Sequence, residues 1–379
     1  MGRHLISLID GTAVSASRTK GYEGYSNVYE LAHLLKLKGR SEDGKPQVVF
    51  YTSGISSQPD TWDMINLATG NSIQSQIVDQ YTSICANFDF SSSTQQDTIY
   101  IFGFSRGAMA ARALAGLISI YGLLHPRDIR AIPLVMEAWQ AGRTLPDEIR
   151  FKPVKIEFVG IFDAVMGGVE WIKAFNPIVF PNHVLTQNVN HAVHLLSIDE
   201  NRYFFRPKPW SSRTPSRGLF RQVWIPGVHS DIGGTGNTVW GRTSLLTMTH
   251  YLDKYTDLAI DDDWLLRKEQ NLRNSFQGGM LFIDPHKWRI NYARGPIGTD
   301  DSCEYYHPLI DLIKDCTYDG QKRYDWRAKV FEKRFAGLHI ESGLSAYFQR
   351  VLKGLPKPKR RVKKSTSPRE LSLVGGSAG

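Results

Sequence analysis

Short, mostly apolar runs recur along the chain as far as residue 225. They cover residues 4–9, 47–51, 98–102, 154–162 and 222–225. Apolar runs of this length without a strict apolar–polar alternation are typical of strands that are covered on both faces, as in parallel sheets. The pattern therefore predicts a set of buried parallel strands.

Segments with helical spacing of apolar positions separate most of these runs. Val28, Leu31, Leu34 and Leu35 fall on one helical face. Further helices are expected over residues 73–88, 108–124, 132–141 and 242–256, and around His191 and His194, whereas residues 166–190 are expected to be irregular. Alternating strands and helices predict an α/β fold, with a mostly parallel sheet and helices on both faces.

The periodicity weakens after residue 256. Residues 257–352 carry many Trp, Tyr and Arg residues and predict a helical cap or accessory region. Residues 353–379 combine basic residues with Pro, Ser and Gly, a composition typical of a disordered tail. We expect three parts: a core over residues 1–256, an accessory region over 257–352 and a basic tail over 353–379.

The formal net charge of +9 comes mostly from this tail, because basic residues cluster between Lys353 and Arg369. The rest of the chain is close to neutral, so a nucleic-acid groove on the folded part is not expected. The tail itself could bind anionic lipid headgroups, bind nucleic acid without sequence preference, or remain solvated.

The three cysteines, Cys85, Cys303 and Cys316, are too few and too far apart for a disulfide framework or a zinc site. No metal or cofactor is expected. The N-terminal apolar run is too short for a signal peptide, and no window approaches a membrane span. A protein that is cytoplasmic where it is made is therefore expected, with any delivery elsewhere following another route.

The sequence Gly103-Phe104-Ser105-Arg106-Gly107 matches the pattern G-x-S-x-G, with a predicted strand before it and a helix after it. In this setting a serine lies on a sharp, strained turn that exposes its hydroxyl, and the two glycines let the strand and the helix approach closely. The motif predicts a nucleophilic serine, Ser105, in an α/β-hydrolase-like fold.

A serine nucleophile needs a histidine base and a carboxylate that orients the histidine, in the chain order Ser, acid, His. Asp163 directly follows a predicted strand and is the preferred acid, with Asp199 as the alternative. His229 lies in a glycine-rich loop after the last predicted strand and is the preferred base, with His191 and His194 as alternatives.

Backbone N–H groups normally stabilise the oxyanion in such sites. The residue after the nucleophile, Arg106, is one candidate, and the turn at Gly11 and Thr12 after the first strand is the other. Asp10 is expected to brace that turn by hydrogen bonds, and Asp231 to fix the geometry of the His229 loop.

These motifs together resemble the DUF2235 group, the Tle1-like catalytic domain of type VI secretion lipase effectors. The resemblance spans roughly residues 4–236 and rests on these segments, in the order of the family: Ile9-Asp-Gly-Thr, Gly103-Phe-Ser-Arg-Gly-Ala, Val159-Gly-Ile-Phe-Asp-Ala-Val, Ser197-Ile-Asp-Glu-Asn-Arg and Gly227-Val-His-Ser-Asp-Ile-Gly-Gly. It implies an α/β hydrolase that cleaves phospholipid esters, typically as a phospholipase A, with Ser105, Asp163 and His229 as the triad.

The resemblance also implies a phospholipid membrane as the substrate surface, and an immunity or secretion-apparatus protein as a partner of an antibacterial or defence effector. The apolar stretch from Trp171 to Phe180 could form a lid or an acyl-binding wall. Two alternatives stay open: an esterase for a small soluble or carbohydrate ester, and an inactive binding module with a basic tail that binds lipid or nucleic acid.

Overall fold

The computed structural model describes most of the chain up to residue 277 and several later segments. The described residues are 2–11, 14, 25–38, 43–54, 71–91, 96–166, 184–202, 205–213, 218–236, 238–277, 303–310, 317–318, 321–322 and 338–353. The apolar stretch at 171–180, Thr12 and the basic tail beyond Lys353 lie outside the described residues.

An eight-stranded sheet, in the order β14-β11-β10-β8-β6-β3-β1-β2, runs through the middle of the described part, and all its strand pairs are parallel. Its strands are β1 (His4–Ile9), β2 (Gln47–Thr52), β3 (Thr98–Phe104), β6 (Ile156–Phe162), β8 (Val189–Ser197), β10 (Phe220–Ile225), β11 (Glu304–Tyr306) and β14 (His339–Ile340). Shorter ribbons pair β4 (Leu123–Leu124) with β5 (Phe151–Lys152), β7 (Val184–Leu185) with β9 (Ser212–Arg213), and β12 (Thr317–Tyr318) with β13 (Gln321–Lys322).

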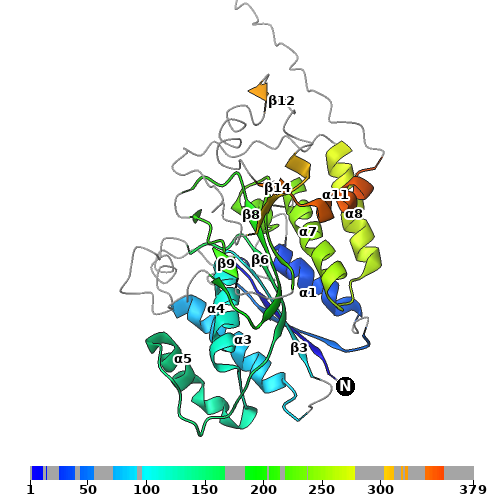
Figure 1. Cartoon of the computed structure of the whole chain (residues 1–379). Helices are drawn as coiled ribbons and strands as arrows, with labels where there is room; N and C mark the ends of the chain where they lie inside the picture. Colours follow the sequence, from blue (N-terminus) through cyan, green and yellow to red (C-terminus); the bar gives the residue numbers. More distant parts are fainter. Residues whose placement is uncertain are drawn as a thin grey trace, which may run out of the picture.

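Helices cover both faces of the sheet (Figure 1). On one face lie α3 (Asn71–Asn87), α4 (Arg106–Tyr121), the 3₁₀ helix η1 (Pro126–Ala131) and α5 (Ile132–Ala141). On the other lie α1 (Asn27–Lys38), α7 (Val239–Tyr255), α8 (Asp262–Gln277) and α11 (Ser342–Val351), and a short helix, α6 (His229–Ile232), precedes α7. The predicted α/β architecture is confirmed.

The apolar runs of the sequence are explained by two separate cores. Successive residues of a strand point to opposite faces of the sheet. Leu5 and Ile9 accordingly join the core under α3 and α4, while Ile6 and Leu8 join the core under α1 and α7. Because both faces of such a strand are covered, apolar side chains occur at successive positions, and the sequence shows no strict alternation.

The prediction of a helix around His191 and His194 was wrong. Residues 189–197 form β8, which lies in the sheet between β6 and β10. The two histidines interrupt the apolar run of this strand, and each is held by a backbone N–H: His191 Nδ1 accepts from Leu219, and His194 Nε2 accepts from Ala164. Hydrogen bonds to neighbouring strands thus make polar residues compatible with a buried strand.

Residues beyond 256 also contribute to the sheet. β11 pairs with β10, and β14 pairs with β11, so both strands extend one edge, while α8 and α11 pack near α7. The predicted boundary after residue 256 remains a proposal. β11 and β14 follow this boundary but belong to the same sheet as the strands that precede it.

The strand order reverses its direction at β1, so a topological switch point lies above the carboxyl ends of β1 and β3. The chain passes from β1 through α1 to β2 on one side of β1, and then through α3 to β3 on the other side. The connecting helices therefore diverge to opposite faces, and ligand sites of open parallel sheets lie at such switch points. The segments that follow β1, β3, β6, β8 and β10 all reach this edge.

Candidate active site

Ser105 occupies the sharp turn between β3 and α4. Its backbone has φ 58° and ψ −123°, a region that residues other than glycine rarely adopt. Such conformations cost on the order of 1–3 kcal/mol and persist only where the surroundings impose them. Asp163, at the end of β6, has φ 42°. Three described residues other than glycine have a positive φ; two of them are the predicted nucleophile and the predicted acid, and the third is Cys303.

The glycines around Ser105 are required by close backbone contacts. A Cβ on Gly103 would lie 2.4 Å from the carbonyl oxygen of Gly107, and a Cβ on Gly107 would lie 2.4 Å from that of Ile9. These distances are far below van der Waals contact, so β1, β3 and the first turn of α4 can meet only if both positions lack a side chain. The glycines of G-x-S-x-G therefore bring the nucleophile against the end of β1.

We expect Gly107→Ala to lower the free energy of unfolding by about 3 kcal/mol, near the upper end of the usual cost of overpacking. The new methyl group would meet backbone atoms of Ile9 and Asp10, which cannot move without opening the sheet. Denaturant unfolding measures the change. Gly142→Ala is the control: Gly142 has φ 62° but open space around it, so only the backbone cost of about 1–2 kcal/mol applies.

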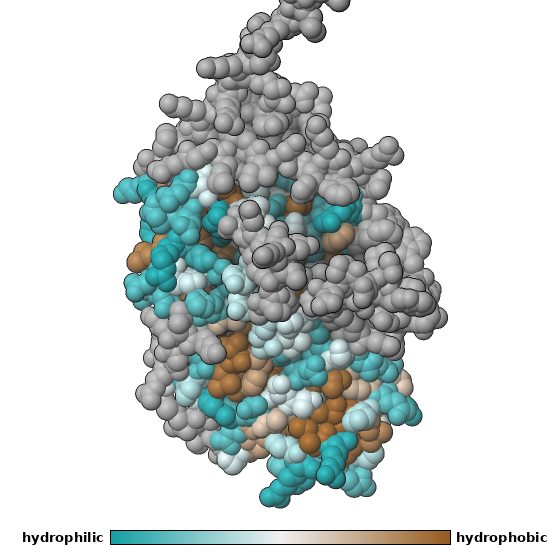
Figure 2. Space-filling view, turned by 180° about the vertical axis from the view of Figure 1, so that it is seen from behind, coloured by the Kyte–Doolittle hydropathy of each residue, from teal (hydrophilic) through white to brown (hydrophobic). Residues whose placement is uncertain are grey.

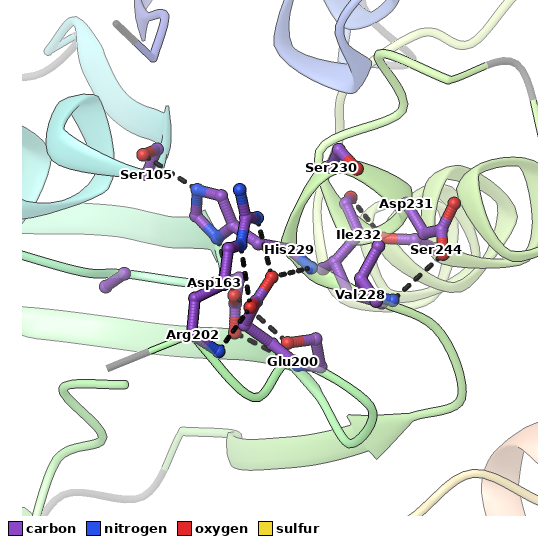
Figure 3. A network of polar contacts seen from close by, with 12 residues as sticks. Ser105, Asp163, Glu200, Arg202, Val228, His229, Ser230, Asp231, Ile232 and Ser244 are labelled. Atoms are coloured by element: carbon purple, nitrogen blue, oxygen red, sulfur yellow. Dashed lines mark hydrogen bonds and ion pairs between the residues drawn. The ribbon is translucent and has the colours of Figure 1, made fainter. Parts of the chain in front are cut away.

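Ser105, His229 and Asp163 form a continuous chain of hydrogen bonds (Figure 3). His229 Nε2 lies 2.9 Å from Ser105 Oγ, and His229 Nδ1 lies 2.6 Å from Asp163 Oδ2. A neutral imidazole with its proton on Nδ1 satisfies both contacts, because Nε2 can then accept from the serine hydroxyl. This is the arrangement in which a histidine can take the proton of a serine nucleophile.

The triad residues are nearly enclosed. Asp163 is 0% exposed, His229 5% and Ser105 7%. Asp163 is also held by Ser197, whose N–H donates to Oδ1 at 3.0 Å and whose hydroxyl donates to Oδ2 at 3.2 Å. A buried carboxylate with these donors stays fixed in orientation, as the acid of such a triad must.

The rival acid and bases have other partners. Asp199 exchanges hydrogen bonds with Gly227, since its Oδ2 accepts from the Gly227 N–H at 2.9 Å and its own N–H donates to the Gly227 carbonyl. Arg202, which lies close to Asp199 in the sequence, forms its ion pair with Glu200. His191 and His194 lie within β8, as described above, rather than at the edge with Ser105.

The supporting residues brace the loops around the triad. Asp231 accepts from the Val228 N–H at 2.9 Å and from the Thr238 hydroxyl at 2.8 Å, and so closes the turn that begins α6. Arg106 is the first residue of α4, where backbone N–H groups point out of the helix. Burial lowers the pKa of its guanidinium to about 10.

Gly11 lies directly beside the nucleophile. A Cβ at this position would be 3.0 Å from Ser105 Cβ and 2.8 Å from Phe104 Cδ1. The Gly11 N–H donates to Asp10 Oδ1 at 2.8 Å, so this donor is engaged by the carboxylate that braces the turn. Of the two oxyanion candidates in this turn, Gly11 is thus occupied, and Thr12 lies outside the described residues.

Asp10 is a buried carboxyl at the end of β1. Besides the Gly11 N–H, it accepts hydrogen bonds from the hydroxyls of Ser26 and Tyr51. Burial disfavours the charged form and outweighs these donors, which raises the pKa of Asp10 from 3.8 to about 6. The group is therefore expected to change its charge under mildly acidic conditions.

We expect this carboxyl to make stability depend on pH. Between about pH 4 and pH 6 the folded protein keeps the Asp10 proton that the unfolded chain has lost, so the free energy of unfolding falls as the pH rises. The loss is on the order of 3 kcal/mol. Denaturant unfolding gives the free energy of unfolding of the wild type and of Asp10→Asn from pH 4 to pH 7. The loss is the change with pH in the difference between the two proteins. A difference that stays constant over this range would contradict the assignment.

Three residues of the site escaped the sequence analysis: Ser197, Glu200 and Phe205. Ser197 and Glu200 belong to the segment Ser197-Ile-Asp-Glu-Asn-Arg, which carried the family resemblance, and Phe205 follows it. Among the described residues, no three His, Cys, Asp or Glu side chains gather so that they could hold a metal ion. No described helix is both long and apolar enough to cross a membrane.

Comparison with known proteins assigns the chain to a family. Residues 3–252 match the family model described as T6SS, phospholipase effector Tle1-like, catalytic domain. The chain is 29% identical over 231 residues to the uncharacterized protein YEL023C of Saccharomyces cerevisiae, a match that covers 54% of this chain and 32% of the yeast protein.

Two solved structures are also similar. One is an uncharacterized protein from Pseudomonas aeruginosa (18% identity, TM-score 0.41, 72% of this chain and 48% of the other). The second is the Tle1 effector bound to the VgrG spike from the type 6 secretion system (20% identity, TM-score 0.38, 63% of this chain and 52% of the other). The matches thus span from about a third to about half of the length of these relatives.

Proposed function

Because the chain belongs to the family of the T6SS phospholipase effector Tle1-like catalytic domain, we propose that it is a serine hydrolase that cleaves carboxylic esters of membrane phospholipids, as a phospholipase of the A type. The observation that carries the proposal is the hydrogen-bonded chain from Ser105 through His229 to Asp163 at a strained strand-to-helix turn.

In the proposed reaction, Ser105 Oγ attacks the ester carbonyl carbon while His229 Nε2 takes the hydroxyl proton. Asp163 remains charged and stabilises the imidazolium through Nδ1. The carbonyl oxygen becomes an oxyanion, and the backbone N–H of Arg106 at the start of α4 is its proposed donor, assisted by the positive end of the helix dipole.

Collapse of this intermediate breaks the ester bond, and the lysophospholipid leaves as an alcohol with the proton from His229. A fatty acyl group then remains on Ser105. Water adds to the acyl-enzyme with His229 again as the base, which releases the fatty acid and restores the serine hydroxyl. All proton transfers in this scheme pass through His229, and no other group of the chain is required to change its charge.

The contact with lipid is a separate part of the proposal. Figure 2 shows apolar residues on one face of the molecule, divided by hydrophilic ones. Among the described residues, the exposed large apolar side chains are Tyr25, Ile120, Leu134 and Leu266. A secretion-apparatus or immunity protein as partner, and delivery to a target cell, remain proposals.

Fatty acid release from vesicles tests the proposal. The protein is incubated with vesicles of phosphatidylcholine and phosphatidylglycerol that carry palmitoyl and oleoyl chains at different positions. Mass spectrometry identifies the products. Release of one fatty acid supports the proposal and identifies the acyl position. Turnover of a short soluble ester without any lipid cleavage would keep the triad and reject the lipid substrate. Cleavage of neither would favour the inactive binding module.

A further inference from the structure

The segment that follows β8 lies between the acid and the base of the triad. In the sheet, β8 is flanked by β6, which ends at Asp163, and by β10, which leads to His229. Asp199 and Glu200 are therefore placed where they can reach both loops. Asp199 holds Gly227, two residues before His229, as described above.

Glu200 supports His229 itself. It is 2% exposed, and its Oε2 accepts from the backbone N–H of His229 at 3.2 Å. Figure 3 shows its carboxylate between the guanidinium of Arg202 and the backbone nitrogen of His229. Arg202 binds both carboxylate oxygens, through Nε at 2.9 Å and Nη2 at 2.7 Å. This bidentate pair compensates the burial of the carboxylate and fixes its plane.

The ring of His229 is held from two sides by aromatic residues. Its centroid lies 4.8 Å from that of Phe104 and 4.8 Å from that of Phe205, whose ring stands edge-on to the imidazole. The guanidinium carbon of Arg202 lies over the ring of Phe205, 3.7 Å from its centroid. Arg202 thus links the carboxylate that holds the His229 backbone to one of the rings that hold its side chain.

We propose that Glu200 and Arg202 are a positioning pair for His229, which keeps Nε2 of the imidazole in hydrogen-bond distance of Ser105 Oγ. The inference rests on the proposed function, because it assigns the pair a role in the hydrolysis. Neither residue needs to touch the substrate. A purely structural ion pair would affect the stability of the fold but would leave kcat and the placement of the imidazole unchanged.

Two variants separate the contributions of the pair. Glu200→Gln keeps an oxygen for the His229 N–H but removes the negative charge, and Arg202→Met removes the cation but keeps an apolar stem beside Phe205. Each is expected to lower kcat by about 10-fold and leave KM within about 2-fold, because the base is misplaced while substrate binding is not. Glu200→Ala, which removes the acceptor as well, is expected to lower kcat by about 100-fold.

The titration of His229, followed by NMR, gives a readout that does not need activity. A negative charge stabilises the imidazolium and a positive charge destabilises it. The midpoint is therefore expected to move to lower pH in Glu200→Gln and to higher pH in Arg202→Met, by about 0.5–1 pH unit in each case. Asp10, Arg106, Asp163, Asp199 and Asp231 are the other charged residues of the elements that meet at this site. They are the same in both variants, so a difference in midpoint comes from Glu200 or Arg202.

Glu341→Gln is the matched control. Glu341 is also a buried carboxylate paired with an arginine, Arg221, whose guanidinium lies over the ring of Tyr305. This pair connects β10 with the start of α11, away from the triad, so Glu341→Gln is expected to change thermal stability but neither kcat nor the midpoint of His229.

Opposite midpoint shifts together with the loss of kcat support the proposal. An unchanged midpoint and a kcat within about 2-fold of the wild type, in both variants of the pair, would overturn it. Absence of ester hydrolysis by the wild-type protein would instead reject the proposed function, and the positioning role with it, even where the midpoints of His229 move as expected.

Discussion

Fatty acid release from phospholipid vesicles is expected to fall by about 10⁴-fold or more when Ser105 is replaced by alanine. The substitution removes only the hydroxyl oxygen that lies 2.9 Å from His229 Nε2. Alanine has the same backbone restrictions as serine, so the strained turn gains no further strain and the fold is expected to persist. Single-turnover rates of both proteins at equal concentration measure the loss.

Ser83→Ala is the control for this prediction. Ser83 lies in α3, where its hydroxyl donates to the carbonyl of Asp79 within the same helix. Its loss is expected to leave hydrolysis within about 2-fold of the wild type, since surface substitutions have small effects. Equal rates for wild type and Ser105→Ala would reject Ser105 as the nucleophile.

Asp163→Asn is expected to lower kcat by about 10³–10⁴-fold without loss of the fold. The Ser197 N–H donates to Oδ1 and requires an oxygen there, so the new amide group would face His229. The imidazole would then have to accept at Nδ1 and carry its proton on Nε2. In that tautomer it cannot accept the proton of Ser105.

The backbone of this variant should be unaffected, because asparagine tolerates the φ of 42° at position 163 better than most residues. Asp97→Asn is the matched control. Asp97 is also a buried carboxylate and is bound by Arg3. It lies just before β3, at the end of the strand opposite to the triad. Its substitution is expected to affect stability and not kcat. Retention of kcat within about 10-fold in Asp163→Asn would reject Asp163 as the acid.

The elements predicted correctly from the sequence are those with a strong local signal. β1, β3, β6 and β10 are short, mostly apolar segments, and α4 follows a strand that runs into the glycine of G-x-S-x-G. The order Ser, acid, His then selects Asp163 and His229 from the ends of two of these strands, and the structure brings both to Ser105. The carboxyl ends of parallel strands meet at one edge of the sheet, so the order of these residues along the chain was enough to predict that they lie together.

What the sequence analysis missed depends on neighbours in the sheet. Polar residues in β8 are satisfied by Leu219, Ala164 and Gln222, none of which is near in sequence, so its local pattern favoured a helix. β11 and β14 are only three and two residues long and give no periodic signal. Because Ser197 and Glu200 reach the triad only through the position of β8, their roles could not be predicted without the strand order.

Reaction with a fluorophosphonate, followed by peptide mass spectrometry, is the most direct test that Ser105 is an activated nucleophile. The reagent forms a stable covalent bond with a serine oxygen that a neighbouring base has activated, whatever the natural ester is. We expect a single adduct, on Ser105, in the wild-type protein and slow or absent labelling in His229→Ala. An adduct on another residue, or equally fast labelling of wild type and His229→Ala, would contradict the catalytic site described above.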